Sequence, residues 1–120
     1  MNTYLRREKQ RGATERMLEE AARVLVSEQK VGIVLMHPDH IAIAKLRLAK
    51  LLIPHVATFD IPYCMDRVVW INAREASKCV DFRTFTLMED RTMSVLCDHA
   101  VLENRYGAIL NHWLRFAKEE

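Results

Sequence analysis

The sequence lacks any hydrophobic run long enough to cross a membrane. Its longest apolar stretches, residues 31–36 and 51–53, are followed by polar residues or proline well before the roughly 18 residues that a spanning helix needs. The first residues, MNTYLRREKQR, also lack the apolar core of a secretory signal peptide. These absences predict a cytoplasmic protein that has no membrane partner.

The sequence is also poor in cysteine, glycine and proline, with three residues of each. Cys64, Cys79 and Cys97 are widely spaced and form none of the close pairs that zinc ribbons and redox motifs use, so reduced thiols are expected. No segment is of low complexity, and 50% of the 120 residues are hydrophobic. This composition argues against disorder and predicts one compact domain spanning residues 1–120.

Charge is nearly balanced overall but concentrated at the start of the chain. The formal net charge is +2, from 18 basic and 16 acidic residues. Residues 1–11 nevertheless form a basic N-terminal segment, in which Glu8 is the single acid. We interpret this segment as solvated. The alternative is a nucleic-acid contact, for which the candidate residues are Arg6, Arg7 and Lys9.

Apolar residues recur with helical or strand periodicity along the chain. Helical spacing predicts helices at residues 14–29, 38–53 and from 101 onward, and apolar or alternating runs predict strands at 31–36, 67–72, 82–87 and 93–97. Residues 55–62 fit either a short strand or a connection. The alternation of helices with strands predicts an α/β fold, with a mainly parallel sheet flanked by helices.

The last predicted helix carries a regular apolar stripe. Its members, spaced four or three residues apart, are Leu102, Tyr106, Ile109, Trp113 and Phe116. We expect this stripe to pack on the sheet and close the core. The alternative is a subunit interface of a homo-oligomer, anchored by the aromatic residues.

Two short segments place reactive residue types where α/β folds bind anions. Gly12-Ala13-Thr14 opens the first predicted helix, where free N–H groups and the helix dipole attract anions, and we expect Thr14 to cap that helix. Asp98-His99 follows the strand at 93–97. An acid in this position orients a metal ion or its water in phosphate-binding folds, whereas the structural alternative is that Asp98 caps the last helix.

These two segments resemble the small P-loop-like proteins encoded by bacteriophages. Those proteins carry a degenerate loop of the form GRTTRM, here GATERM at residues 12–17, and a late strand that ends in DH, here VLCDHAVLENRYGAIL at residues 95–110. The resemblance covers both ends and the first strand, about half of the chain. It implies a P-loop/Rossmann-like fold, a viral protein in the host cytoplasm, and a nucleotide as ligand together with Mg²⁺. The phosphate-binding residues that it implies are Arg11, Gly12, Thr14, Arg16, Asp98 and His99.

The sequence departs from a working phosphate loop at three points. Arg7 stands in the position of the leading glycine, Ala13 stands in the position of the lysine, and the residues before Gly12 are too polar for the strand that normally feeds the loop. Arg11 or Arg16 can bring positive charge, but not with the geometry of the missing lysine. Because phosphoryl transfer depends on positioned positive charge, the chain is not expected to be an efficient enzyme.

Two functions follow from the sequence. The first is a non-catalytic or weakly nucleotide-binding protein that acts by binding host or viral protein machinery. The alternative is a P-loop-like protein that binds a nucleotide or nucleic-acid phosphate and keeps residual NTPase activity.

A third candidate site is the cluster His37-Pro38-Asp39-His40, whose imidazole and carboxylate groups are metal-ligand types. Ligands taken from four consecutive residues at a helix start seldom converge on one ion. We therefore interpret the cluster as the polar beginning of a helix, with metal binding as the alternative.

Overall fold

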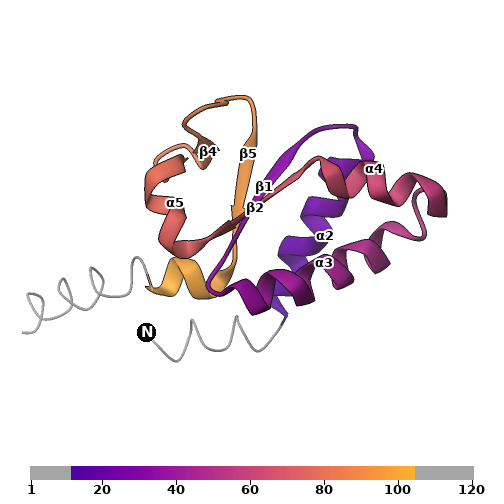
Figure 1. Cartoon of the computed structure of the whole chain (residues 1–120), viewed down its shortest axis with the longest axis horizontal. Coiled ribbons are helices and arrows are strands. Elements are labelled where there is room, and N and C mark those ends of the chain that lie inside the picture. Colours follow the sequence, from indigo (N-terminus) through magenta and orange to yellow (C-terminus); the bar gives the residue numbers. More distant parts are fainter. Residues whose placement is uncertain (1–11, 105–120) are drawn as a thin grey trace, which may run out of the picture.

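The computed structural model describes residues 12–104. Its helices are α2 (Ala13–Val26), α3 (Pro38–Leu52), α4 (Ile61–Asp66) and α5 (Ala73–Cys79), with the 3₁₀ helix η1 (Thr58–Asp60). Its strands are β1 (Val31–Leu35), β2 (Val68–Asn72), β3 (Val80–Asp81), β4 (Thr86–Leu87) and β5 (Ser94–Cys97) (Figure 1). Residues 99–104 are helical. The expected strands at 31–36, 67–72 and 93–97 are confirmed to within two residues at each end.

The strands form one mixed five-stranded sheet with the order β2-β1-β5-β4-β3. β1 pairs in parallel with β2 on one side and with β5 on the other. β4 is antiparallel to β5, and β3 is antiparallel to β4. The expected α/β architecture is confirmed, with parallel pairing at the centre of the sheet and two short antiparallel strands at one edge.

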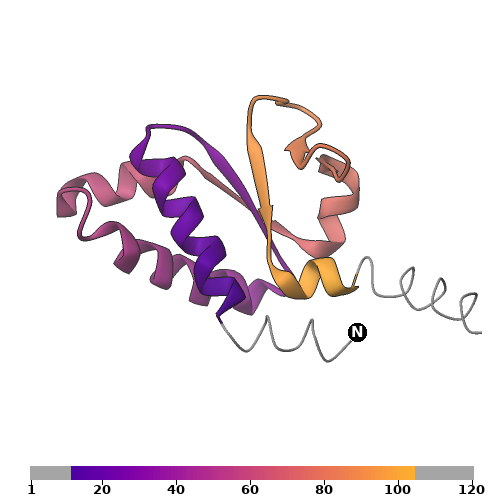
Figure 2. The ribbon, with the colours of Figure 1, turned by 180° about the vertical axis from the view of Figure 1, so that it is seen from behind.

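Helices cover both faces of the sheet, and each face has its own apolar core. α2, α3 and α4 pack on one face, where the alternate β1 residues Val31, Ile33 and Leu35 are buried. α5 and the helix at 99–104 pack on the other face, where Val34 lies in a smaller cluster with Ala76 and Val101. Figures 1 and 2 show these two layers on opposite sides of the strands. The burial of all five β1 residues explains why this strand reads as a continuous apolar run.

Two short helices and one strand differ from the sequence-based expectation. Residues 55–62 are neither a strand nor a plain connection, because they contain η1 and the start of α4. The polar residues after β2 form α5, and Asn72 caps it by accepting a hydrogen bond from the Glu75 N–H at 3.1 Å. α4 and α5 are too short for their helical periodicity to be recognised in the sequence.

The prediction of a strand at residues 82–87 is wrong over most of that range. Asp81 ends β3, and its carboxylate and carbonyl accept hydrogen bonds from the N–H groups of Arg83 and Phe85. Phe85 has a φ of 53°, which is incompatible with an extended strand. The alternation that suggested a strand therefore spans a turn, and β4 begins only at Thr86.

The last predicted helix begins where the structure ends. Val101 is 3% exposed and packs in the smaller core, whereas Leu102, the first residue of the predicted stripe, is partly buried. Tyr106, Ile109, Trp113 and Phe116 lie outside the described residues, as does the basic segment 1–11. Within residues 12–104, no helix is long and apolar enough to cross a bilayer.

Candidate functional site

The carboxyl ends of β1 and β5 lie next to each other, and the chain leaves them toward opposite faces of the sheet. β1 leads into α3, which packs on the larger core, whereas β5 leads into residues 99–104, whose Val101 packs in the smaller one. The strand order reverses at this point, because β2 lies on one side of β1 and β5 on the other. Open α/β sheets bind their ligands in the crevice at such a switch point.

The first turn of α2 lies at the same edge of the sheet. Gly12 precedes the helix with φ 83° and ψ 36°, a left-handed conformation that glycine adopts without steric penalty. No side chain caps α2, so the expectation that Thr14 is the cap is wrong. The first N–H groups of α2 thus keep their hydrogen-bonding capacity, and the helix dipole adds positive potential there.

Thr14 is instead engaged with the end of β5. Its hydroxyl donates a hydrogen bond of 2.6 Å to Oδ1 of Asp98, although the two residues are 84 positions apart. Asp98 is held in place by its own backbone, since its N–H donates to the Val34 carbonyl at 2.9 Å and its carbonyl accepts from the Val101 N–H at 3.0 Å. Its side chain therefore faces Thr14, while its main chain begins the next helix.

Asp98 is the buried polar residue of the described chain, with 6% of its surface exposed. A buried carboxylate is unfavourable unless hydrogen bonds or a cation compensate the loss of water. A carboxylate has about four acceptor positions, and the Thr14 hydroxyl fills one of them. The arrangement leaves acceptor capacity beside a helix N-terminus.

A pocket of about 230 Å³ opens beside this pair. It is lined by Thr14, Leu18, His40, Ile43, Ala44, Arg47, Asp98 and Ala100. The guanidinium of Arg47 lies 4.0 Å from the carboxylate of Glu15, and both side chains are about half exposed. The pocket therefore combines two oxygen ligands, a basic side chain and an apolar wall contributed by α2 and α3.

The residues of the implied phosphate site lie in different places in the structure. Thr14 and Asp98 are hydrogen-bonded and line one pocket, and Gly12 precedes the helix that carries Thr14. Arg16 is on the exposed side of α2. His99 begins the helix after β5, and its Nε2 is buried without a hydrogen-bond partner in the described part of the chain.

The remaining sequence candidates lie outside the described residues. They are Arg11 of the implied phosphate site and Arg6, Arg7 and Lys9 of the nucleic-acid alternative.

Arg47 and His40 line the pocket but were not expected there. Both come from α3, and the sequence holds no local signal that α3 would begin beside the start of α2. Only the crossing of these two helices brings Arg47 to the same side of the sheet as Asp98. A charged residue on the half-exposed side of a helix is otherwise read as part of a solvated face.

The His37, Asp39 and His40 cluster does not form a metal centre. The rings of His37 and His40 meet edge to face with their centroids 5.1 Å apart, and the two residues line different pockets. Within residues 12–104, no group of three or more potential ligands among His, Cys, Asp and Glu is arranged to hold a metal ion. The interpretation as a polar helix start fits this geometry, since His37 is the N-cap position and Pro38 the first residue of α3.

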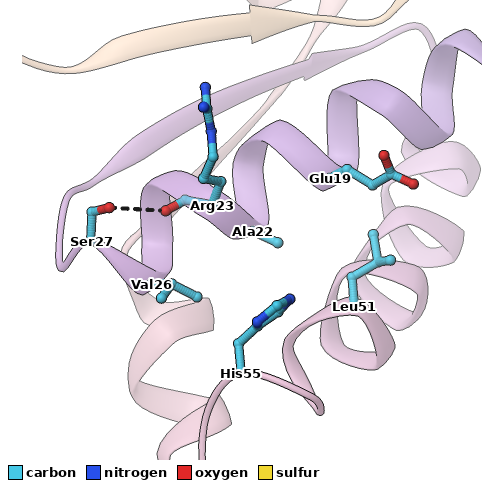
Figure 3. Close-up of a pocket in the computed structure, with 7 residues that line it drawn as sticks. All are labelled: Glu19, Ala22, Arg23, Val26, Ser27, Leu51 and His55. Atoms are coloured by element: carbon cyan, nitrogen blue, oxygen red, sulfur yellow. Dashed lines mark hydrogen bonds between the residues drawn. The ribbon is translucent and has the colours of Figure 1, made fainter.

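A larger pocket, of about 330 Å³, lies at the opposite end of α2. Its lining comes from the last turns of α2 and from the end of α3, and comprises Glu19, Ala22, Arg23, Val26, Ser27, Leu51 and His55 (Figure 3). Ser27 donates its hydroxyl to the Arg23 carbonyl at 3.2 Å, and Arg23 forms an ion pair with Glu20 at 2.6 Å. Ser27 and Arg23 are thus engaged within α2, and Glu19 and His55 are the other polar residues of this lining.

The chemistry available at the carboxyl edge is oxygen coordination together with anion binding. Mg²⁺ prefers hard oxygen ligands and is often held by one or two protein groups plus phosphate oxygens and water. The Thr14 hydroxyl and the Asp98 carboxylate are groups of this kind. A comparison of the chain with protein-family models, with curated proteins and with solved structures finds no match.

Proposed function

We propose that the pocket between α2 and Asp98 binds a phosphate-bearing ligand together with Mg²⁺, and that a nucleoside triphosphate is its natural type. The observation that carries this proposal is the hydrogen bond of 2.6 Å between Thr14 and Asp98. In nucleotide-binding α/β proteins, a hydroxyl at a helix start and an acid at a strand end hold the metal jointly. On this proposal the chain is a degenerate relative of the phage P-loop-like proteins that its two motifs resemble.

Positive groups near the pair support the phosphate part of the proposal. Within residues 12–104 no side-chain cap is seen at the N-terminus of α2, and Arg47 stands on the wall of the same pocket. A ligand phosphate would compete with Glu15 for Arg47, because their separation of 4.0 Å between half-exposed groups makes a weak ion pair. The exchange would cost little and would give the phosphate a guanidinium partner.

Binding without efficient hydrolysis is the expected behaviour. Ala13 stands where a phosphate loop has its lysine, and Arg47 approaches from a different helix. A guanidinium held from another direction does not reproduce the lysine contact to the terminal phosphates. Loss of one such positioned charge costs about two or more powers of ten in rate.

Calorimetric titration of the full chain with ATP and with GTP, each with Mg²⁺ and again with EDTA, tests the proposal. We expect binding that requires Mg²⁺, with an affinity about tenfold or more weaker in Thr14→Val, which loses the hydroxyl ligand, and in Asp98→Asn, which loses the negative charge. Thr14→Ser keeps the hydroxyl and should bind like the parent chain. Thr84→Val, on the exposed turn before β4, is the matched control for a lost threonine.

Three results would contradict this function: no heat at millimolar nucleotide, equal binding in EDTA, or equal binding by Thr14→Val and the parent chain. Circular dichroism of each variant separates loss of the ligand site from loss of the fold. Phosphate release measured on the same samples should stay at the level of the buffer, and rapid turnover would contradict the non-catalytic part.

The protein-binding function indicated by the sequence concerns a different surface. The pocket holds a small ligand, whereas contact with a protein needs an extended area of exposed side chains. The structure offers such an area on the outer side of α3.

A further inference from the structure

α3 carries apolar side chains on two sides, although it lies in the outer layer of the protein. Ala44, Leu48 and Leu52 face the core and are at most 3% exposed. Ile43, Leu46 and Ile53 are 53%, 68% and 58% exposed. Their spacing of three and seven residues places them along one side of the helix. Large apolar side chains along the exposed side of a helix can serve as a contact surface for a partner.

The chain that follows α3 adds two exposed aromatic residues. Phe59 in η1 is 76% exposed, and Tyr63 in α4 is 71% exposed. Five of the eight exposed large hydrophobic residues of the described chain thus fall between positions 43 and 63. Isolated exposed hydrophobics are ordinary, but such concentration in one segment marks an interaction surface.

The same side of α3 carries more basic than acidic residues. Lys50 lies between Leu46 and Ile53 on the helix surface and Arg47 borders it, whereas Asp39, one turn before Ile43, is the one acid of α3. Lys45 is directed elsewhere, because its ammonium lies 5.8 Å from the centre of the Trp70 ring on β2. We call Ile43, Leu46, Lys50 and Ile53 the outer face of α3.

We propose that the outer face of α3 binds an amphipathic helix of a partner protein, apolar along one side and acidic along the flank that meets Lys50 and Arg47. The eleven residues from Ile43 to Ile53, the C-cap of α3, span about 15 Å, which matches about three turns of a helical partner. Ridges of the partner can pack into the grooves between these side chains in the usual manner of helix pairs. This surface meets the phosphate pocket at Ile43 and at Arg47, whereas Leu46, Lys50 and Ile53 lie outside it.

Charge favours an acidic partner over a second copy of the chain as the occupant. A two-fold dimer through the outer face would join two surfaces that each have two basic residues, Lys50 and Arg47, against one acid, Asp39. Like charges placed together across an interface cost free energy, whereas an acidic partner gains from both groups.

The buried side of α3 decides against a membrane surface. A helix lying in a bilayer interface needs a strongly polar face rich in lysine and arginine turned toward water. Here the side of α3 opposite the outer face packs in the protein core. Only two basic residues, Lys50 and Arg47, lie on or beside the outer face.

The test uses a displayed library of random peptides of about 15 residues, long enough for four helical turns. Selection against the parent chain should enrich peptides with apolar residues at helical spacing and with Glu or Asp beside them. A fluorescein-labelled enriched peptide should then bind at least tenfold more weakly to Leu46→Ser and to Lys50→Glu. Met88→Ser removes an exposed apolar residue outside the face, and it should leave the affinity unchanged.

Specific results would overturn this proposal. One is enrichment of basic or featureless peptides, and another is equal peptide binding by the parent chain and Leu46→Ser. Co-sedimentation of the chain with phosphatidylserine vesicles, lost in Leu46→Ser, would assign the face to a lipid surface. A dimer in analytical ultracentrifugation that Leu46→Ser converts to monomer would assign it to self-association.

Discussion

Gly32 occupies the middle of β1, directly opposite Val95 on the neighbouring strand. A Cβ atom placed on Gly32 would lie 3.1 Å from Cγ2 of Val95, which is tighter than ordinary van der Waals contact. We expect Gly32→Ala to lower the free energy of unfolding by about 1 kcal/mol, because overpacking outweighs the stiffening of the unfolded chain. Urea denaturation of the two proteins measures the difference.

The double variant identifies the cause. Val95→Ala removes the crowding methyl group, so adding Gly32→Ala to it should be neutral or stabilising. If Gly32→Ala costs the same free energy in both backgrounds, the close approach of Val95 is not the reason for glycine at this position.

The sequence motifs placed Thr14 and Asp98 in one candidate site, but they did not predict that Thr14 bonds to Asp98 instead of capping α2. Short motifs indicated that both residues belong to one site. The sequence alone does not say whether a hydroxyl at a helix start turns back to its own N–H groups or outward to a strand end. That choice depends on where β5 ends, which is set by tertiary packing.

Among the elements, the hairpin of β3 and β4 combines a buried residue, Val80, with a charge contact at Asp81. Asp81 at the end of β3 accepts a hydrogen bond from the Arg91 guanidinium in the turn before β5. This bond, and then the N–H of Arg83, hold the pKa of Asp81 below its ordinary value of 3.8. A carboxyl whose pKa is lowered by folding stabilises the fold above its ordinary pKa, and this contribution is lost as pH falls through the lowered value.

We therefore expect Arg91→Gln to raise the pKa of Asp81 toward 3.8. Carbon-13 NMR titration of the carboxyl groups measures the change. Asp90 is the internal control, because its pKa is lowered mainly by hydrogen bonds from Thr92 and should stay in place. An unchanged pKa at Asp81 would mean that the ion pair is not populated in solution.

Long elements were predictable and short ones were not. α2 and α3 run for 14 and 15 residues, enough for the apolar stripe to repeat, and β1 is buried on both faces. α4 has 6 residues and α5 has 7, less than two full turns, so their spacing resembles that of a loop. β3 and β4 have 2 residues each and are defined by pairing with each other, which no local pattern encodes.

For the whole molecule, the sheet is predicted to be unequally stable across its width. β1 has a paired strand on each side and all of its residues are buried, whereas β3 and β4 are short and lie at one edge. Backbone amides exchange fastest where few buried contacts hold the segment closed. We expect β1 amides to show the slowest hydrogen exchange by NMR and those of β3 and β4 to exchange far faster. Equal protection across the sheet would mean that the hairpin opens only with global unfolding.

The position of β5 between β1 and β4 has a consequence for synthesis on the ribosome. Of the described strands it is the last in sequence, yet it is the one that joins the parallel pair to the hairpin. A nascent chain that has not yet released residues 94–97 leaves the polar backbone of β1 open along one side, with the apolar core beside it. Exposed strand edges of this kind recruit other chains. Until residues 94–97 have left the ribosome and paired, β1 therefore keeps one edge open to such contacts.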